Sequence, residues 1–139
     1  MTNLLIITHG DFGAYLLEAA EEIVGRDPRQ EARAISISRR IPLDEVRRRI
    51  ATQLDTLAGE SGDGILILCD MLGGTPCNET LLLAGTRKDV SILTGVNLYM
   101  VISALVNSKK LGISELSDKV SRDGQRAVVN AKVLIETKR

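Results

Sequence analysis

Two polar side chains follow apolar runs in this sequence, and together they can activate a nucleophile. His9, the only histidine, comes after the run 4–8 (LLIIT), and Asp70 comes after the run 64–69 (GILILC). Unbroken apolar runs are typical of parallel strands buried on both faces, and the carboxyl ends of such strands are where sites form in open α/β folds. If the two strands are neighbours, Asp70 can bind one ring nitrogen of His9 and leave the other as an oriented nucleophile.

A glycine-rich segment directly after Asp70 has the properties of an anion site. Gly73 and Gly74 let another group approach closely and leave their N–H groups exposed. Thr75 is a favoured N-cap and the proline after it is a favoured first helical residue, so a helix is expected to begin here. Helix N-termini bind anions. We therefore predict that Gly73, Gly74 and Thr75, together with Gly10, bind a phosphoryl group at His9.

Each of these features also has a simpler interpretation. A lone histidine is often a turn or surface residue, an aspartate after a strand is often a loop residue, and a Gly-Gly-Thr-Pro segment is often only a turn with a helix cap. Their joint placement at two strand ends favours phosphoryl transfer, because oriented donors supply most of the catalysis in that reaction. In this interpretation His9 attacks the phosphoryl group and Asp70 stabilises the cationic ring.

The remaining pattern alternates between strands and helices and predicts the α/β class. Strands are expected at 4–8, 32–38, 64–69 and 90–94, and helices at 14–24, 42–57, 77–84, 98–106 and 114–126. Right-handed crossovers then give a doubly wound, mainly parallel sheet flanked by helices, with the first and third strands adjacent. The segment 128–135 is predicted to be a last strand. No repeat or linker divides the chain, so we expect one domain over 1–139.

Composition excludes several classes of function. The 18 basic and 18 acidic residues give a net charge of zero, and the chain has one Phe, two Tyr and no Trp, so nothing indicates nucleic-acid binding. Cys69 and Cys77 have neither metal-site spacing nor a secretory context, which predicts two thiols in a reducing cytoplasm. No apolar stretch is long enough to span a membrane, and the first residues lack the basic start of a signal peptide.

Three segments resemble the signatures of a known family. They are 8–13 (THGDFG) with two leucines at 16–17, 70–78 (DMLGGTPCN) and 94–100 (TGVNLYM). In order and spacing they are similar to those of the mannose/fructose-type IIA domains of the bacterial phosphoenolpyruvate-dependent sugar phosphotransferase system. The likeness covers nearly the whole chain. Tyr99 stands where the third motif usually has proline, and Met71 and Leu72 stand where many members have an aromatic residue, which puts partner contacts in doubt more than chemistry.

The resemblance implies a phosphohistidine relay with no sugar pocket of its own. The donor would be the histidine-containing phosphocarrier protein and the acceptor a IIB component, so the membrane is involved only through transporter subunits. Donor and acceptor are then both imidazoles of similar basicity, and neither metal nor cofactor is expected. Family members are often homodimers in which a C-terminal strand joins the partner's sheet, and we expect the same of 128–135.

Two other functions stay open at this point. The first is a regulatory phosphoprotein of the same system that takes no part in transport. The second is the phosphotransfer subunit of a dihydroxyacetone kinase, which has a similar fold but usually lacks the Gly-Gly-Thr/Ser-Pro run.

Overall fold

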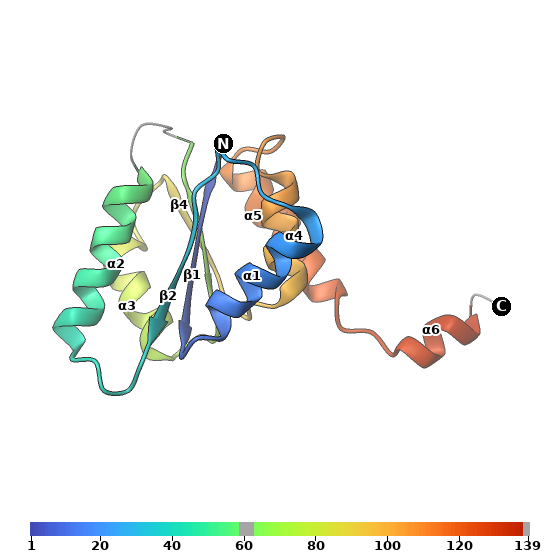
Figure 1. The fold of residues 1–139 in the computed structure, drawn as a ribbon, viewed down its shortest axis with the longest axis horizontal. Coiled ribbons are helices and arrows are strands. Elements are labelled where there is room, and N and C mark those ends of the chain that lie inside the picture. Colours follow the sequence, from blue (N-terminus) through green and yellow to red (C-terminus); the bar gives the residue numbers. More distant parts are fainter. Residues whose placement is uncertain (59–62, 138–139) are drawn as a thin grey trace.

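The computed structural model describes residues 1–58 and 63–137 of the chain and shows alternating strands and helices (Figure 1). In chain order, the elements are β1 (Asn3–His9), α1 (Phe12–Val24), β2 (Ala32–Ile37), α2 (Leu43–Ala58), β3 (Ile65–Cys69), α3 (Thr75–Ala84), β4 (Val90–Leu93), α4 (Leu98–Asn107), α5 (Ile113–Arg126) and α6 (Ala131–Thr137).

The four strands form one parallel sheet in the order β2-β1-β3-β4. The predicted α/β class and the adjacency of the first and third strands are confirmed. β1 and β3 are the two central strands, and every residue of β3 is buried. Their register pairs Ile7 with Cys69, so His9, two residues after Ile7, and Asp70, directly after Cys69, lie at the same edge of the sheet.

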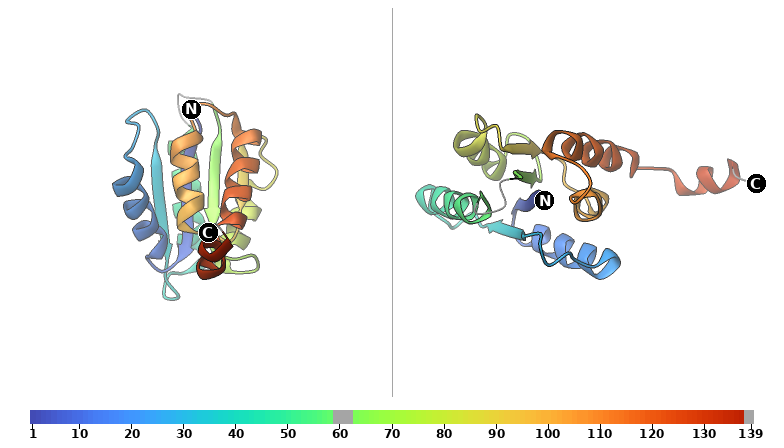
Figure 2. Two further views of the ribbon diagram at one scale, coloured as in Figure 1. Left: turned by 90° about the vertical axis from the view of Figure 1, so that its right-hand side faces the viewer. Right: turned by 90° about the horizontal axis from the view of Figure 1, so that it is seen from above.

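The helices cover both faces of the sheet (Figures 1 and 2). α2 and α3 lie on one face, and α1, α4 and α5 lie on the other. Because successive side chains of a strand point to opposite faces, β1 contributes Leu5 and Ile7 to the core beneath α2 and α3. Leu4 and Ile6 pack into the core beneath α1, α4 and α5. An apolar run without alternation is what a sheet covered on both faces requires.

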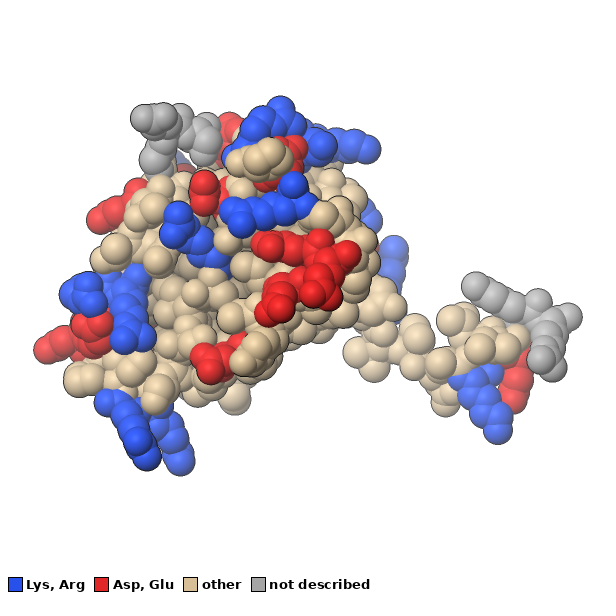
Figure 3. All heavy atoms as spheres, viewed as in Figure 1, with Lys and Arg blue, Asp and Glu red and all other residues tan. Residues whose placement is uncertain are grey.

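The surface carries mixed charge. On the face shown in Figure 3, acidic and basic side chains are interspersed. Ion pairs of the protein include Arg29 with Asp27 at 2.8 Å and Lys119 with Asp123 at 3.0 Å. No helix among residues 1–58 and 63–137 combines the length and the apolar character that crossing a bilayer requires.

The C-terminal segment is not the strand that the sequence predicted for 128–135. After α5 the chain extends away from the body, and Ala131–Thr137 forms the short helix α6 (Figures 1 and 2). Asn130 begins this helix, since its side-chain oxygen accepts from the N–H of Val133 at 3.1 Å. None of the residues in α6 is buried. With no neighbouring strand to pair with, the segment satisfies its backbone locally, as a helix does and an isolated strand cannot. We refer to residues 128–137 as the C-terminal arm.

Candidate functional site

The turn between β1 and α1 fixes where the histidine leaves the sheet. Thr8 is fully buried, and its hydroxyl donates to the carbonyl of Gly10 at 3.1 Å and accepts from the N–H of Gly13 at 3.2 Å. A Cβ on Gly13 would lie 2.8 Å from the Thr8 hydroxyl, so only glycine permits this approach. Gly10 turns the chain with a φ of 61°, a conformation that favours glycine. His9 is thereby held at the carboxyl edge of the sheet.

The structure brings His9 and Asp70 together as predicted. Nδ1 of His9 lies 2.6 Å from Oδ2 of Asp70, and the same oxygen accepts from the backbone N–H of His9 at 2.9 Å. The other carboxylate oxygen accepts from the N–H of Met71 at 2.9 Å. The imidazole is 46% exposed and the carboxylate only 10%. The carboxylate is therefore anchored in the protein while the ring remains accessible.

The charge state of Asp70 determines which ring nitrogen of His9 is available. Partial burial would raise the pKa of the Asp70 carboxyl, but hydrogen bonds from the His9 backbone, the His9 ring and the Met71 N–H outweigh it and lower that pKa. An ionised carboxylate can only accept, so the proton of a neutral ring is assigned to Nδ1. The lone pair then lies on Nε2, the ring nitrogen that does not contact Asp70.

The start of α3 lies against the imidazole. A Cβ on Gly74 would be 2.6 Å from Cε1 and 3.4 Å from Nε2 of His9. Gly73 precedes it with a φ of 90°. Among the residues that the structure describes, none accepts from the N–H groups of Gly74 and Thr75. These groups are therefore free to bind an anion at the ring, as helix N-termini do.

Two details of the predicted anion site are wrong. Gly74, not Thr75, is the N-cap of α3, and the helix begins at the exposed Thr75 with no side-chain cap. An extended Gly74 followed by Pro76 in the first turn, where proline needs no N–H donor, explains the earlier start. The N–H of Gly10 donates to the carbonyl of Ile37 at 2.9 Å. Gly10 therefore shapes the turn, and its N–H is not free for a phosphoryl group.

The two thiols near this edge are buried and unbridged. Burial, above all, raises the pKa of Cys69 to about 12, so it stays protonated and unreactive at neutral pH. Within the described ranges no group of three or more His, Cys, Asp or Glu side chains is placed to hold a metal ion.

Large apolar side chains that follow His9 and Asp70 closely in the sequence are exposed. Phe12 is 43% exposed, Met71 55% and Leu72 70%. Exposed apolar residues beside a reactive group are typical of a surface that another protein covers. Sequence reasoning singled out the family departures at Met71 and Leu72 but did not predict this exposure. It also did not predict that the buried Thr8 hydroxyl holds the turn after β1. The signal in the sequence is a polar residue at the end of a wholly apolar run.

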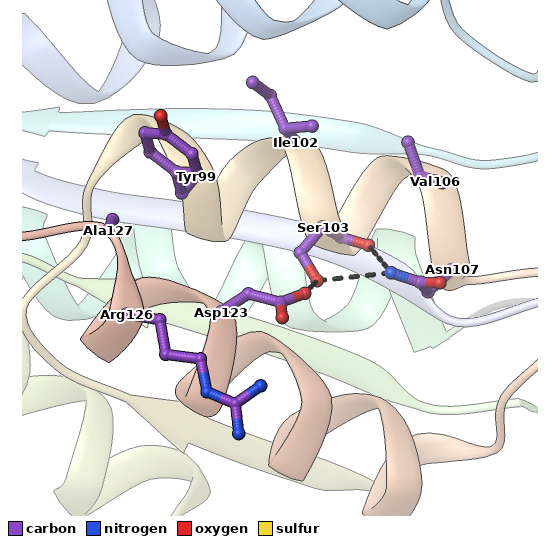
Figure 4. A pocket seen from close by; sticks show the side chains of 8 residues that line it. All are labelled: Tyr99, Ile102, Ser103, Val106, Asn107, Asp123, Arg126 and Ala127. Atoms are coloured by element: carbon purple, nitrogen blue, oxygen red, sulfur yellow. Dashed lines mark hydrogen bonds between the residues drawn. The ribbon is translucent and has the colours of Figure 1, made fainter. Parts of the chain in front are cut away.

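A separate hollow of about 370 Å³ lies between α4 and α5 (Figure 4). Tyr99, Ile102 and Val106 form its apolar side, and Ala127, the residue before the C-terminal arm, also lines it. At its base the Ser103 hydroxyl donates to Asp123 at 2.6 Å. These polar groups bind each other, so the hollow presents an apolar surface rather than a second reactive centre.

Comparison with known proteins gives a family match and several similar solved structures. A family model described as "PTS system fructose IIA component" matches residues 3–121. A phosphotransferase system component EIIA from Streptococcus agalactiae is 26% identical, with 96% of this chain and 99% of that chain covered at a TM-score of 0.81. A mannose/sorbose specific IIA subunit from Enterococcus faecalis is 29% identical, with 93% of both chains covered at a TM-score of 0.80. A PTS IIA protein from Streptococcus pneumoniae, associated with a fucose utilization operon, shares the fold at 23% identity and a TM-score of 0.84.

Proposed function

This chain belongs to the fructose IIA component family of the phosphotransferase system, and we propose that it is a phosphohistidine relay. Members of this family take part in phosphoryl transfer in sugar uptake systems. The finer proposal is that residues 1–139 act as one IIA domain in the cytoplasm, with His9 taking a phosphoryl group from the histidine-containing phosphocarrier protein and passing it to a IIB component. The observation that carries the proposal is the 2.6 Å contact between Nδ1 of His9 and Asp70.

The proposed step exchanges one nitrogen–phosphorus bond for another. The lone pair on Nε2 of His9 forms a bond to phosphorus as the bond to the donor's imidazole breaks, and that bond's electron pair returns to the donor ring. Asp70 accepts the hydrogen bond from Nδ1–H and stabilises the positive charge that develops on the His9 ring. Transfer to the IIB component repeats the exchange with His9 as the leaving group.

The free N–H groups of Gly74 and Thr75 would bind the phosphoryl oxygens. In phosphoryl transfer the charge is spread over the equatorial oxygens, so donors already oriented toward them lower the barrier. The Thr75 hydroxyl is exposed at the same helix end and would add a further donor. A relay also needs a surface that two different partners can cover in turn, which Phe12, Met71 and Leu72 would provide.

We also propose that the protein is a homodimer. The C-terminal arm exposes large apolar side chains, including Val128 at 87% and Ile135 at 60%. An isolated seven-residue helix is not stable on its own in water. A second copy of this chain would bury the apolar side chains of the arm, which are exposed here.

The relay is tested by intact mass spectrometry. We expect the protein to gain one phosphoryl group when incubated with phosphoenolpyruvate, enzyme I and the phosphocarrier protein, and we expect His9→Ala to gain none. Adding a IIB component should then remove the group. A phosphorylated His9→Ala variant would overturn the proposal, whereas phosphorylation of the wild type without transfer to any IIB component would favour the regulatory alternative.

A further inference from the structure

The segment 94–97 between β4 and α4 contacts the backbone on both sides of Asp70. The N–H of Gly95 donates to the carbonyl of Asp70 at 3.0 Å, and the N–H of Val96 donates to the carbonyl of Cys69 at 3.1 Å. These bonds lie beyond the last pair of the β3–β4 ladder, Leu68 with Leu93, and join the loop after β4 to the end of β3. Both peptide groups that flank the Asp70 Cα thus accept a hydrogen bond from this loop.

The side chain of Asn97 holds this loop in place from two directions. Its Oδ1 accepts from the N–H of Met100 at 3.1 Å and caps α4, while its Nδ2 donates to the carbonyl of Gly124 on α5 at 3.3 Å. Because one partner is a donor and the other an acceptor, the orientation of the amide is determined. Only an amide can make both bonds, since a carboxylate lacks the donor and an alanine lacks both.

Two glycines make the arrangement possible. Gly95 has a φ of 76°, with open space where a Cβ would project. Gly124 is buried, and a Cβ there would collide with the Met100 side chain, so its absence lets the α5 backbone come within reach of Asn97. Gly95, Asn97 and Gly124 therefore all contribute to the position of the 94–97 segment against Asp70.

We propose that Asn97 is a positioning residue for phosphoryl transfer. It acts through Gly95 and Val96 on Asp70, and through Asp70 on the orientation and tautomer of the His9 ring. The role in transfer rests on the proposed function. The effect of Asn97 on the His9 ring is independent of the proposed function, because it is a property of the protein without phosphate.

Nuclear magnetic resonance of the single histidine gives a readout that a purely structural role would not change. In ¹⁵N-labelled protein with a neutral ring, we expect wild-type His9 to show a protonated Nδ1 and an unprotonated Nε2. We expect Asn97→Ala to move both ring nitrogen signals toward an averaged position and to lower the single-turnover phosphorylation rate about 10- to 100-fold, the range expected for small misplacements of reacting groups. The KM for the phosphocarrier protein should not change.

Two further variants separate positioning from helix capping. Asn97→Asp keeps the cap on α4 and removes the donor to Gly124, so we expect displaced ring signals although α4 remains capped. Asn130 makes the same kind of cap at 3.1 Å on α6, remote from Asp70, and Asn130→Ala should leave the His9 signals and the rate unchanged.

The outcomes distinguish this inference from the proposed function. Wild-type ring signals in Asn97→Ala and Asn97→Asp, whatever the melting temperature, would mean that Asn97 only caps a helix and would overturn the inference. Displaced ring signals in a protein whose wild type takes no phosphate would support the positioning and overturn the relay.

Discussion

The edge that carries His9 and the C-terminal arm differ in what determines their structure. Asp70 is held at its carboxylate by His9 and Met71 and at its backbone by Gly95. The arm has no buried residue, and its hydrogen bonds are local, such as the cap from Asn130 to Val133. One region is fixed by contacts from distant parts of the chain, and the other only by its nearest neighbours.

This difference predicts how each region responds to change. At the edge, small changes should alter the rate of phosphoryl transfer because several contacts define one geometry. In the arm, changes should leave the rate untouched and alter only what the arm binds. The predictions below test that contrast, from the largest expected effect on the rate to the smallest.

Gly74→Val should block transfer. Its Cβ would lie 2.6 Å from Cε1 of His9, where both the ring and the incoming phosphoryl group need space. We expect a rate at least about 100-fold lower, in line with the cost of misplacing reacting groups, measured as single-turnover phosphorylation per folded molecule.

Gly112→Val is the matched control for Gly74→Val. Gly112 is likewise an extended helix N-cap, with φ −69° and ψ 170° against −83° and 161° for Gly74. Nothing lies within 4 Å of a Cβ at Gly112, so this variant should transfer at the wild-type rate. Equal rates for the two variants would show that the start of α3 has no role at His9.

Asp70→Asn should slow transfer by a factor on the order of tens to thousands. An asparagine keeps the shape of the side chain but loses the negative charge and can present a donor to Nδ1, which favours the wrong tautomer. The measurement is again the single-turnover rate, with intact circular dichroism as a check on folding. An unchanged rate would mean that the contact with His9 has no part in the reaction.

Thr75→Ala should have a small effect on the rate and almost none on stability. The exposed side chain makes no cap bond, so the free energy of unfolding should change by less than about 0.5 kcal/mol. Loss of one hydroxyl donor to the phosphoryl group should slow transfer about three- to tenfold, and Thr75→Ser should restore the rate. A large drop in melting temperature with an unchanged rate would show that Thr75 only stabilises the helix.

Replacing Val133, Leu134 and Ile135 together by serine should change assembly and not chemistry. By light scattering at micromolar concentration we expect the wild type near twice the 15.1 kDa chain mass and the triple variant near 15.1 kDa. Both should be phosphorylated at the same rate. Leu82→Ser is the control, because Leu82 on α3 is 72% exposed but lies outside the arm. A wild type that already has the mass of one chain would exclude the homodimer.

The fold and the proximity of His9 to Asp70 could be predicted from the sequence because both depend on patterns within short segments. Apolar runs in β1 and β3 indicated buried parallel strands, and the ends of those strands placed His9 near Asp70. That the N–H of Gly10 is not free for a phosphoryl group could not be predicted. It donates to the carbonyl of Ile37 on β2, and no sequence pattern indicates that hydrogen bond. Nor does the motif at 94–97 reveal by itself that Asn97 reaches Gly124 on α5.

The arm is where sequence reasoning failed. Alternating apolar residues in 128–135 predicted a strand, but a strand needs a neighbour to pair with, and α6 has none. Secondary-structure preference in such a segment is weak, and contacts decide the outcome. The homodimer proposal uses the exposed apolar side chains of the arm, such as Val133 and Ile135.

The central claim is that Asp70 holds Nδ1 of His9 so that Nε2 receives the phosphoryl group. Magnetic resonance of the phosphorylated, ¹⁵N-labelled protein tests it directly, because the chain has a single histidine and so a single pair of ring nitrogens. We predict phosphorus coupling to Nε2 and a proton retained on Nδ1. Phosphorus coupled to Nδ1, or to no nitrogen of the His9 ring, would contradict the account.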